Sequence, residues 1–294
     1  MPNVKTMMRG GSRFYVDHET RVSVPGVTSI LGMLPKPFLQ RWAAKMVAEA
    51  AVDSFDFLQR MVESAGRDAA VDHLKGSPYR YTKLRAGIGS EAHDLFERMA
   101  RGEGRLRVQD AYGQYVMRVG PDMEPYRRAF DEFLTAVNPE LVRAEDIAWS
   151  DTHDYAGSFD AILRVWVIER LDGKTFIDPT RGPDSVPVLL IVDWKTSKDT
   201  YPDVALQMAA YANADKLIDP DGIVHPMPEF DGAAVLHITP EKWAFKPVAI
   251  TEEVFDHFLA LRKTFDWDRT LSKEVLGKPL SASGKLVTGT QRRA

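Results

Sequence analysis

The chain has 294 residues, of which 44% are hydrophobic and 27% are charged, and its formal net charge is -4. This composition is typical of a globular protein with a sizeable buried core, and it differs from the strongly basic composition of proteins that coat nucleic acids. The sequence contains no cysteine, which excludes disulfides, zinc sites with thiolate ligands and iron–sulfur clusters held by cysteine.

The sequence also bears on the cellular compartment. It has no run of apolar residues long enough to span a membrane, so we expect no membrane protein. The N-terminal segment MPNVKTMMRGGSRFY lacks the apolar stretch of a secretion signal. Together with the absence of cysteine, these features lead us to expect a cytoplasmic protein.

The N-terminal half is predicted to be mainly helical. A short hairpin within 12–30 has extended segments on either side of a polar turn. Apolar residues then recur at helical spacing in several segments, which Pro, Gly or Asn residues end. These predicted helices are residues 38–51, 55–74, 88–101 and 123–137.

From residue 141 onward, strand-like and helical segments alternate. Val, Ile and Leu are enriched in the predicted strands, which are 141–149, 157–168, 186–192, 233–238 and 244–250. Helices are predicted at 203–217 and 252–265. We therefore expect an α/β core at 140–276, a helical N-terminal part at 1–139 and a flexible tail at 277–294.

The predicted strand at 186–192 leads directly into Asp193-Trp194-Lys195-Thr196. Its last five residues are all apolar, which indicates a strand buried on both faces. Asp193 and Lys195 are two residues apart, so their side chains project from the same face of a strand. A charge at the end of a buried strand is costly unless it is paired or bound to a metal ion. An Asp-x-Lys pattern also arises by chance. A second copy, Asp172-Gly173-Lys174, lies in a polar turn.

The preceding predicted strand brings in a second carboxylate. Asp160 follows Gly157-Ser158-Phe159 and enters an otherwise apolar segment. Taken alone, Asp160 would be interpreted as an ordinary aspartate of a hairpin turn. If its strand pairs with the Asp193 strand, the two carboxylates converge on a site for Mg²⁺. The Lys195 ammonium would then orient the water that attacks a phosphodiester.

Two predicted helices carry polar pairs at a spacing of four residues, which places both side chains on one helix face. His93 and Glu97 form one pair, and Gln207 and Tyr211 form the other. Either pair is compatible with a purely structural role, because a lone histidine on a helix is more often structural than a ligand. In the functional interpretation, His93 faces a metal ion, and Gly89 lets its helix approach the sheet closely.

Taken in chain order, these patterns resemble the RecB-like and phage-type exonuclease branch of the PD-(D/E)XK nuclease superfamily. The motifs are Gly89-x-x-x-His93, Gly157-x-x-Asp160, Asp193-Trp194-Lys195-Thr196 and Gln207-x-x-x-Tyr211. The resemblance covers residues 83–215 in the order helix, strand, strand, helix. It implies a restriction-endonuclease-like fold, in which a mixed β-sheet core is flanked by helices and joined by a helical N-terminal part.

The resemblance also implies a role for each motif residue. Asp160, Asp193 and the main-chain carbonyl of Trp194 would bind Mg²⁺ or Mn²⁺, with His93 as an additional ligand. Lys195 would activate or position the attacking water. The other motif residues would support the site or contact DNA, namely Thr196, Gln207 and Tyr211.

A basic segment surrounds the predicted His93 helix. Its cationic residues are Arg80, Lys83, Arg85, Arg98, Arg101, Arg105 and Arg107, and Tyr79 and Tyr81 are interleaved with them. Such a segment is often only a solvated surface. Beside a metal site, however, it would bind DNA phosphates, with Lys83 and Arg85 as the candidates.

Three features compare the chain with particular members of the family: two are differences and one is a match. Because it has no cysteine, it cannot carry the iron–sulfur cluster that clamps some relatives. It has no Gly-x-x-x-x-Gly-Lys-Ser/Thr loop, so no helicase motor is expected in it. Glu145 matches an acid that is frequent in the family, and its role is left open.

The expected activity is hydrolysis of DNA phosphodiester bonds by an exonuclease in recombination, repair or phage replication. DNA would be one partner, and a single-strand annealing or recombination protein a second. A phage-encoded enzyme would act in the cytoplasm of its bacterial host. The motifs leave open a structure-specific endonuclease, an RNA substrate, a non-catalytic DNA-binding recombination partner and the oligomeric state. A non-catalytic member would usually lack Asp160, Asp193 or Lys195, and this chain has all of them.

Overall fold

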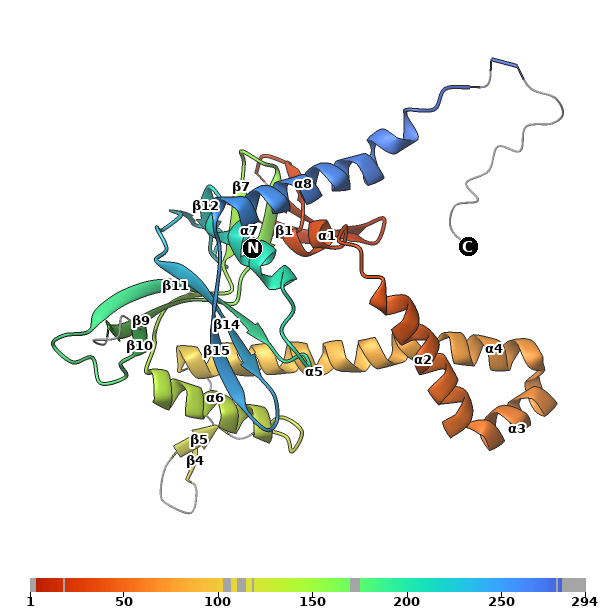
Figure 1. Cartoon of the computed structure of the whole chain (residues 1–294), viewed down its shortest axis with the longest axis horizontal. Coiled ribbons are helices and arrows are strands. Elements are labelled where there is room, and N and C mark those ends of the chain that lie inside the picture. Colours follow the sequence, from red (N-terminus) through yellow and green to blue (C-terminus); the bar gives the residue numbers. More distant parts are fainter. Residues whose placement is uncertain are drawn as a thin grey trace.

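The computed structural model describes residues 4–17, 19–102, 107–109, 115–117, 119–169, 175–278 and 280–281. These residues form a mixed β-sheet with helices on both faces and further helices from the N-terminal part (Figure 1). The predicted α/β class with a mixed sheet is therefore confirmed. In this described part of the chain, no helix is both long and apolar enough to cross a membrane.

The central sheet has the strand order β10-β9-β11-β14-β15, and β6 also pairs with β9. The strands are β6 (Glu140–Ala144), β9 (Ala161–Glu169), β10 (Thr175–Ile177), β11 (Val186–Lys195), β14 (Gly232–Ile238) and β15 (Trp243–Val248). β11 and β14 are parallel, whereas the other neighbours are antiparallel. Ile191 and Val192 of β11 are both fully buried, as the apolar run predicts.

Helices cover both faces of the central sheet. They are α1 (Val27–Leu31), α5 (Ser77–Arg101), α6 (Glu124–Val137), α7 (Asp203–Ala212) and α8 (Glu252–Arg269). On one face, Phe96 of α5 and Phe130 of α6 pack edge-on against Trp194 of β11. On the other face, α1, α7 and α8 share a second apolar cluster. Residues on both sides of position 139 therefore build the same core.

Two smaller sheets extend this core. The second sheet contains β7 (Ile147–Ser150), β8 (Tyr155–Ser158), β12 (Lys216–Ile218) and β13 (Val224–Pro226), and the N-terminal sheet contains β1 (Val4–Arg9), β2 (Ser12–Asp17) and β3 (Ser23–Pro25). Tyr15 and Val24 of the N-terminal sheet share a buried cluster with Trp149 and Ala156 of the second sheet. The N-terminal strands are thus part of the folded body.

A helical arm extends from this body and contacts α5 through α2 (Figure 1). It consists of α2 (Phe38–Asp53), α3 (Phe55–Ala65) and α4 (Arg67–Lys75). The single helix predicted at 55–74 is wrong, because Gly66 has a φ of 86° and separates α3 from α4. A helix interior does not accommodate that conformation.

The remaining short elements are β4 (Arg107–Gln109), β5 (Tyr115–Met117) and the 3-10 helix η1 (Leu271–Lys273).

The predicted strands at 141–149 and 157–168 are each divided into two. Glu145 has a φ of 59° and turns the chain from β6 in the central sheet to β7 in the second sheet. Its N–H donates to the Asp160 carbonyl (3.2 Å), where the chain returns from β8 to β9. The chain therefore crosses between the two sheets twice at one point, and Asp160 lies at that crossing.

The helix predicted at 203–217 is too long, because its last residues form β12. The Asp215 carboxylate accepts hydrogen bonds from the Ser150 hydroxyl (3.0 Å) and from the Thr152 N–H (2.8 Å) in the turn after β7. These bonds draw the chain into the second sheet beside β7. The helix predicted at 88–101 is too short, since α5 begins at Ser77, about three turns earlier.

The strands β1, β4, β5, β10 and β13 are absent from the prediction. Of these, β1, β10 and β13 are edge strands, and most of their side chains are exposed or half-buried, so they lack the apolar alternation that would have indicated them. The predicted flexible tail at 277–294 lies mostly outside the described residues.

Candidate metal centre

The crossing between the sheets places Asp160 beside Asp193. β9 and β11 are antiparallel with Ala161 opposite Val192, so the two aspartates occupy the next step of this register on neighbouring strands. The Trp194 N–H donates a hydrogen bond to Asp160 Oδ2 (2.5 Å). Both carboxylates are largely buried. Strand pairing thus brings together the two acids that the sequence separates by a long segment.

α5 brings His93 to the same point. Its Nδ1 atom lies 3.2 Å from Asp160 Oδ1, and its ring lies edge-on to the Trp194 ring with 6.2 Å between centroids. A Cβ added at Gly89, one turn earlier, would lie 3.4 Å from Thr196 Oγ1. This part of α5 therefore passes close to the end of β11, and His93 faces Asp160 rather than solvent.

Lys195 and Gln207 hold Asp193 from two sides. The Lys195 Nζ atom lies 2.6 Å from Asp193 Oδ2, as expected for side chains on one strand face. Gln207 Nε2 donates to Asp193 Oδ1 (2.9 Å) and to the Tyr211 hydroxyl (3.2 Å), while Gln207 Oε1 accepts from Lys195 Nζ (3.4 Å). Tyr211 is only 1% exposed, so it supports Gln207 and does not reach the surface to contact DNA.

One supporting residue, His237, was not predicted from the sequence. This side chain is buried on β14, directly beside Lys195 in the parallel register. Its Nε2 atom donates to the Ser197 carbonyl (2.7 Å), which fixes the chain immediately after Lys195. The available signal was a polar residue in the otherwise apolar segment 233–238.

Burial and neighbouring negative charges raise the pKa values of Asp193 and Glu145. Burial and the Asp160 charge raise the pKa of Asp193 to about 6, because together they outweigh the ion pair with Lys195. Burial and the same Asp160 charge raise the pKa of Glu145 to about 7. Burial alone would lower the pKa values of His93 and Lys195. The nearby carboxylates outweigh this effect, so both pKa values are raised. A bound cation would relieve this concentration of negative charge.

The donor chemistry of the cluster suits a hard divalent cation. Mg²⁺ takes carboxylate oxygens, and Mn²⁺ also accepts imidazole. Asp193 Oδ2 is buried without a hydrogen bond of normal geometry, although the Lys195 ammonium lies within ion-pair distance of it. Among the residues that the structure describes, no group of three His, Asp or Glu side chains surrounds a common cation position. Lys195 and His93 instead contact the carboxylates directly.

The basic residues near α5 differ in their surroundings. Arg85 Nη2 donates to the Thr196 carbonyl (3.3 Å), so this guanidinium lies at the end of β11. Lys83 is exposed on α5. Arg98 and Arg101 form ion pairs with acids one turn earlier on α5, which compensates their charges locally. Outside the described residues lie Arg105 and the side chain of Arg107.

Comparison of the chain with protein-family models and with curated proteins found no match. The assignment of a function therefore depends on the motif residues and on the geometry that brings them together.

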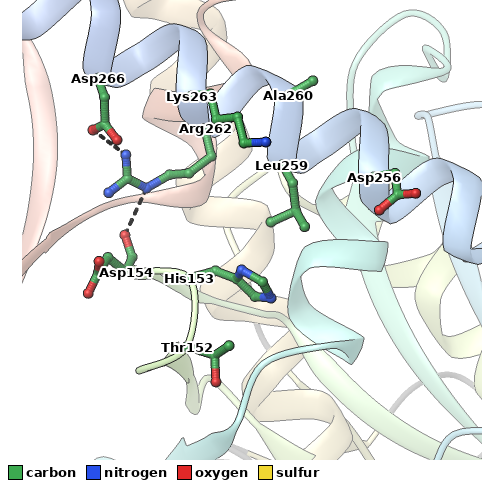
Figure 2. Close-up of a pocket in the computed structure, with 9 residues that line it drawn as sticks. All are labelled: Thr152, His153, Asp154, Asp256, Leu259, Ala260, Arg262, Lys263 and Asp266. Atoms are coloured by element: carbon green, nitrogen blue, oxygen red, sulfur yellow. Dashed lines mark hydrogen bonds and ion pairs between the residues drawn. The ribbon is translucent and has the colours of Figure 1, made fainter. Parts of the chain in front are cut away.

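A cavity of about 550 Å³ lies elsewhere, between α8 and the turn that joins β7 to β8 (Figure 2). Its Arg262 side chain donates from Nε to the Asp154 carbonyl (2.9 Å) and forms an ion pair with Asp266. Asp154 has a φ of 52°, so this contact holds a turn in a left-handed conformation. The arginine thus anchors α8 to the second sheet.

We expect Arg262→Met to lower the free energy of unfolding by about 1 kcal/mol, because the carbonyl loses a charged hydrogen-bond donor. Chemical denaturation would measure this change. The neighbouring Lys263→Met is the control and should have almost no effect, since Lys263 is exposed beside the same cavity. Equal stability of the two variants would contradict the anchoring role.

Proposed function

We propose that this protein is a metal-dependent deoxyribonuclease with the restriction-endonuclease-like fold of the PD-(D/E)XK superfamily. The observation that carries the proposal is the position of Asp160, Asp193 and Lys195, which lie together at the ends of two neighbouring strands. His93 and Gln207 reach the same cluster from α5 and α7, in the chain order of the family motifs.

The proposed ligands are the carboxylates of Asp160 and Asp193, the main-chain carbonyl of Trp194 and the imidazole of His93. A bound Mg²⁺ or Mn²⁺ would supply charge neutralisation at the scissile phosphate and a more acidic water. The excess of buried negative charge around Asp193 and Glu145 supports this assignment. Glu145 would then act as a nearby acid that adds to the negative charge without being a required ligand.

Lys195 orients the attacking water. It also stabilises the negative charge that develops on the phosphate as the water oxygen bonds to phosphorus. Its raised pKa keeps the side chain protonated, so it acts as a cationic hydrogen-bond donor. Gln207 accepts a hydrogen bond from the same ammonium and donates to Asp193. The amide therefore keeps Lys195 and Asp193 in a fixed relation while the buried Tyr211 fixes the amide.

A DNA end is the proposed substrate. The resemblance is to nucleases that resect ends, which is support by analogy. In addition, α5 passes the end of β11 and the helical arm contacts α5, so helices border the site (Figure 1). Such a border favours a strand that enters from a free end.

The test is a time course with a linear duplex labelled at one end and with the same DNA as a covalently closed circle, each with Mg²⁺, Mn²⁺ or a chelator. The expected result is steady release of short products from the linear DNA only, and no products with the chelator. Linearisation of the circle would support the endonuclease alternative on the same site. No cleavage of either DNA with either metal would contradict the proposed function.

We expect His93→Ala to reduce Mn²⁺-supported cleavage more than Mg²⁺-supported cleavage, because imidazole is a better ligand for Mn²⁺. Initial rates over a range of both metals would measure the difference. His257→Ala, an exposed histidine on α8, is the matched control and should leave both rates unchanged. An equal loss with the two metals would indicate that His93 has only a structural role.

A further inference from the structure

A groove of about 900 Å³ lies between α2, α5 and the loop that leads from β11 to α7. Aromatic rings line it. Phe38 and Tyr201 are nearly parallel, with 6.4 Å between ring centroids, and Trp42 and Tyr81 are 5.9 Å apart. Phe38, Tyr81 and Tyr201 are 54%, 46% and 51% exposed. Ring faces that are half exposed in a groove are available for stacking on a ligand.

The groove is also basic, although the whole chain is acidic. Its charged lining residues are Lys36, Lys45, Arg85, Lys198 and Asp203, which give a net charge of +3, compared with -4 for the chain. Lys36 is paired with Asp203 (3.0 Å) and Lys45 with Glu49 (3.4 Å), whereas Lys198 is exposed. The groove therefore suits an anion that also has flat apolar surfaces.

The groove adjoins a smaller cavity that reaches two side chains of the candidate metal centre, Lys195 and Gln207. This cavity of about 280 Å³ is lined by Lys195 and Gln207 and also by Lys36, Ser197, Tyr201 and Asp203. The last four of these residues line the aromatic groove as well. A polymer that occupies the groove would therefore reach Lys195 without leaving the protein surface.

From these observations we infer that the groove binds single-stranded DNA and leads it to Lys195. Phosphates would contact the lysines and Arg85, while unpaired bases would stack on the aromatic rings. Paired bases in a duplex are stacked on one another and expose only their edges, so a duplex would not use these rings. The inference rests on the proposed function for the identity of the polymer, and it makes the substrate at the site an unpaired strand.

Fluorescence anisotropy with a labelled oligo(dT) of about 12 nucleotides, which is within the range of known single-strand sites, would test this inference. A blunt hairpin duplex is the competing probe, and a chelator is present so that no cleavage occurs. We expect the wild type to prefer oligo(dT). We expect Tyr81→Ala and Tyr201→Ala each to weaken its binding about tenfold, the effect of losing one stacked base.

Two controls keep the result interpretable. Trp267→Ala removes an exposed ring on α8 that does not line the groove, and it should bind oligo(dT) like the wild type. Tyr201→Phe keeps the stacking face and should also bind like the wild type. Thermal melting would confirm that each variant is folded.

The inference would be overturned if Tyr81→Ala and Tyr201→Ala bound oligo(dT) as tightly as the wild type, or if they weakened duplex and oligo(dT) binding equally. Because binding is measured without metal, its outcome is separate from that of the cleavage assay. Cleavage without ring-dependent binding would reject the groove and retain the nuclease. Ring-dependent binding without cleavage would support the groove and reject the proposed function.

Discussion

Replacing Lys195 with methionine is expected to lower the rate of DNA cleavage by about 10²-fold or more, the size of effect seen when a group that stabilises the transition state is removed. Methionine has a similar length but cannot donate a hydrogen bond or carry charge. DNA binding should persist, because phosphate contacts are spread over many residues. Single-turnover cleavage and anisotropy on the same preparation would separate the two effects.

The matched control for this prediction is Lys263→Met, which removes an exposed lysine of α8. It should cleave DNA at the wild-type rate. Near-normal cleavage by Lys195→Met would show that another residue orients the attacking water. A parallel loss of DNA binding would instead indicate that Lys195 mainly contacts phosphate.

Gly157→Ala should lower both stability and activity. A Cβ at this position would lie 2.6 Å from Tyr211 Cε1 and 3.2 Å from Val27 Cβ. The Tyr211 ring is buried and cannot move away freely, so we expect a loss of about 1–3 kcal/mol, which is usual for an overpacked core. Displacing Tyr211 would also shift Gln207, which holds Asp193.

Chemical denaturation and a cleavage assay would measure the two effects of Gly157→Ala. Gly87→Ala is the control, because a Cβ there meets nothing within 4 Å and the residue is exposed inside α5. That change should stabilise the protein by about 0.5–1 kcal/mol, since alanine favours a helix more than glycine does. A Gly157→Ala variant as stable as the wild type would contradict the close packing of Tyr211.

Contacts within one element could be predicted from the sequence. The two-residue spacing of Asp193 and Lys195 predicts the same strand face, and they form an ion pair. The four-residue spacing of Gln207 and Tyr211 predicts one helix face, and they form a hydrogen bond. Such contacts depend only on the side-chain periodicity of one strand or one helix, so they can be inferred from the sequence.

Contacts between distant elements could not be predicted in the same way. The crossing at Glu145 depends on a left-handed residue that is not glycine, and no residue pattern indicates that conformation. The aromatic groove joins Phe38 and Trp42 of α2 to Tyr201, which follows β11. These rings meet only because α2 packs on α5 beside the end of that strand.

The proposed metal-dependent cleavage of DNA can be tested with a linear duplex, the wild type and Asp193→Asn, assayed side by side with Mg²⁺, Mn²⁺ and a chelator. Asn keeps the shape of the side chain and removes the negative charge that holds a cation. We predict metal-dependent cleavage by the wild type and none by Asp193→Asn, with both proteins folded. Cleavage by Asp193→Asn at the wild-type rate, or cleavage by the wild type in the chelator, would contradict a catalytic metal ion at Asp193.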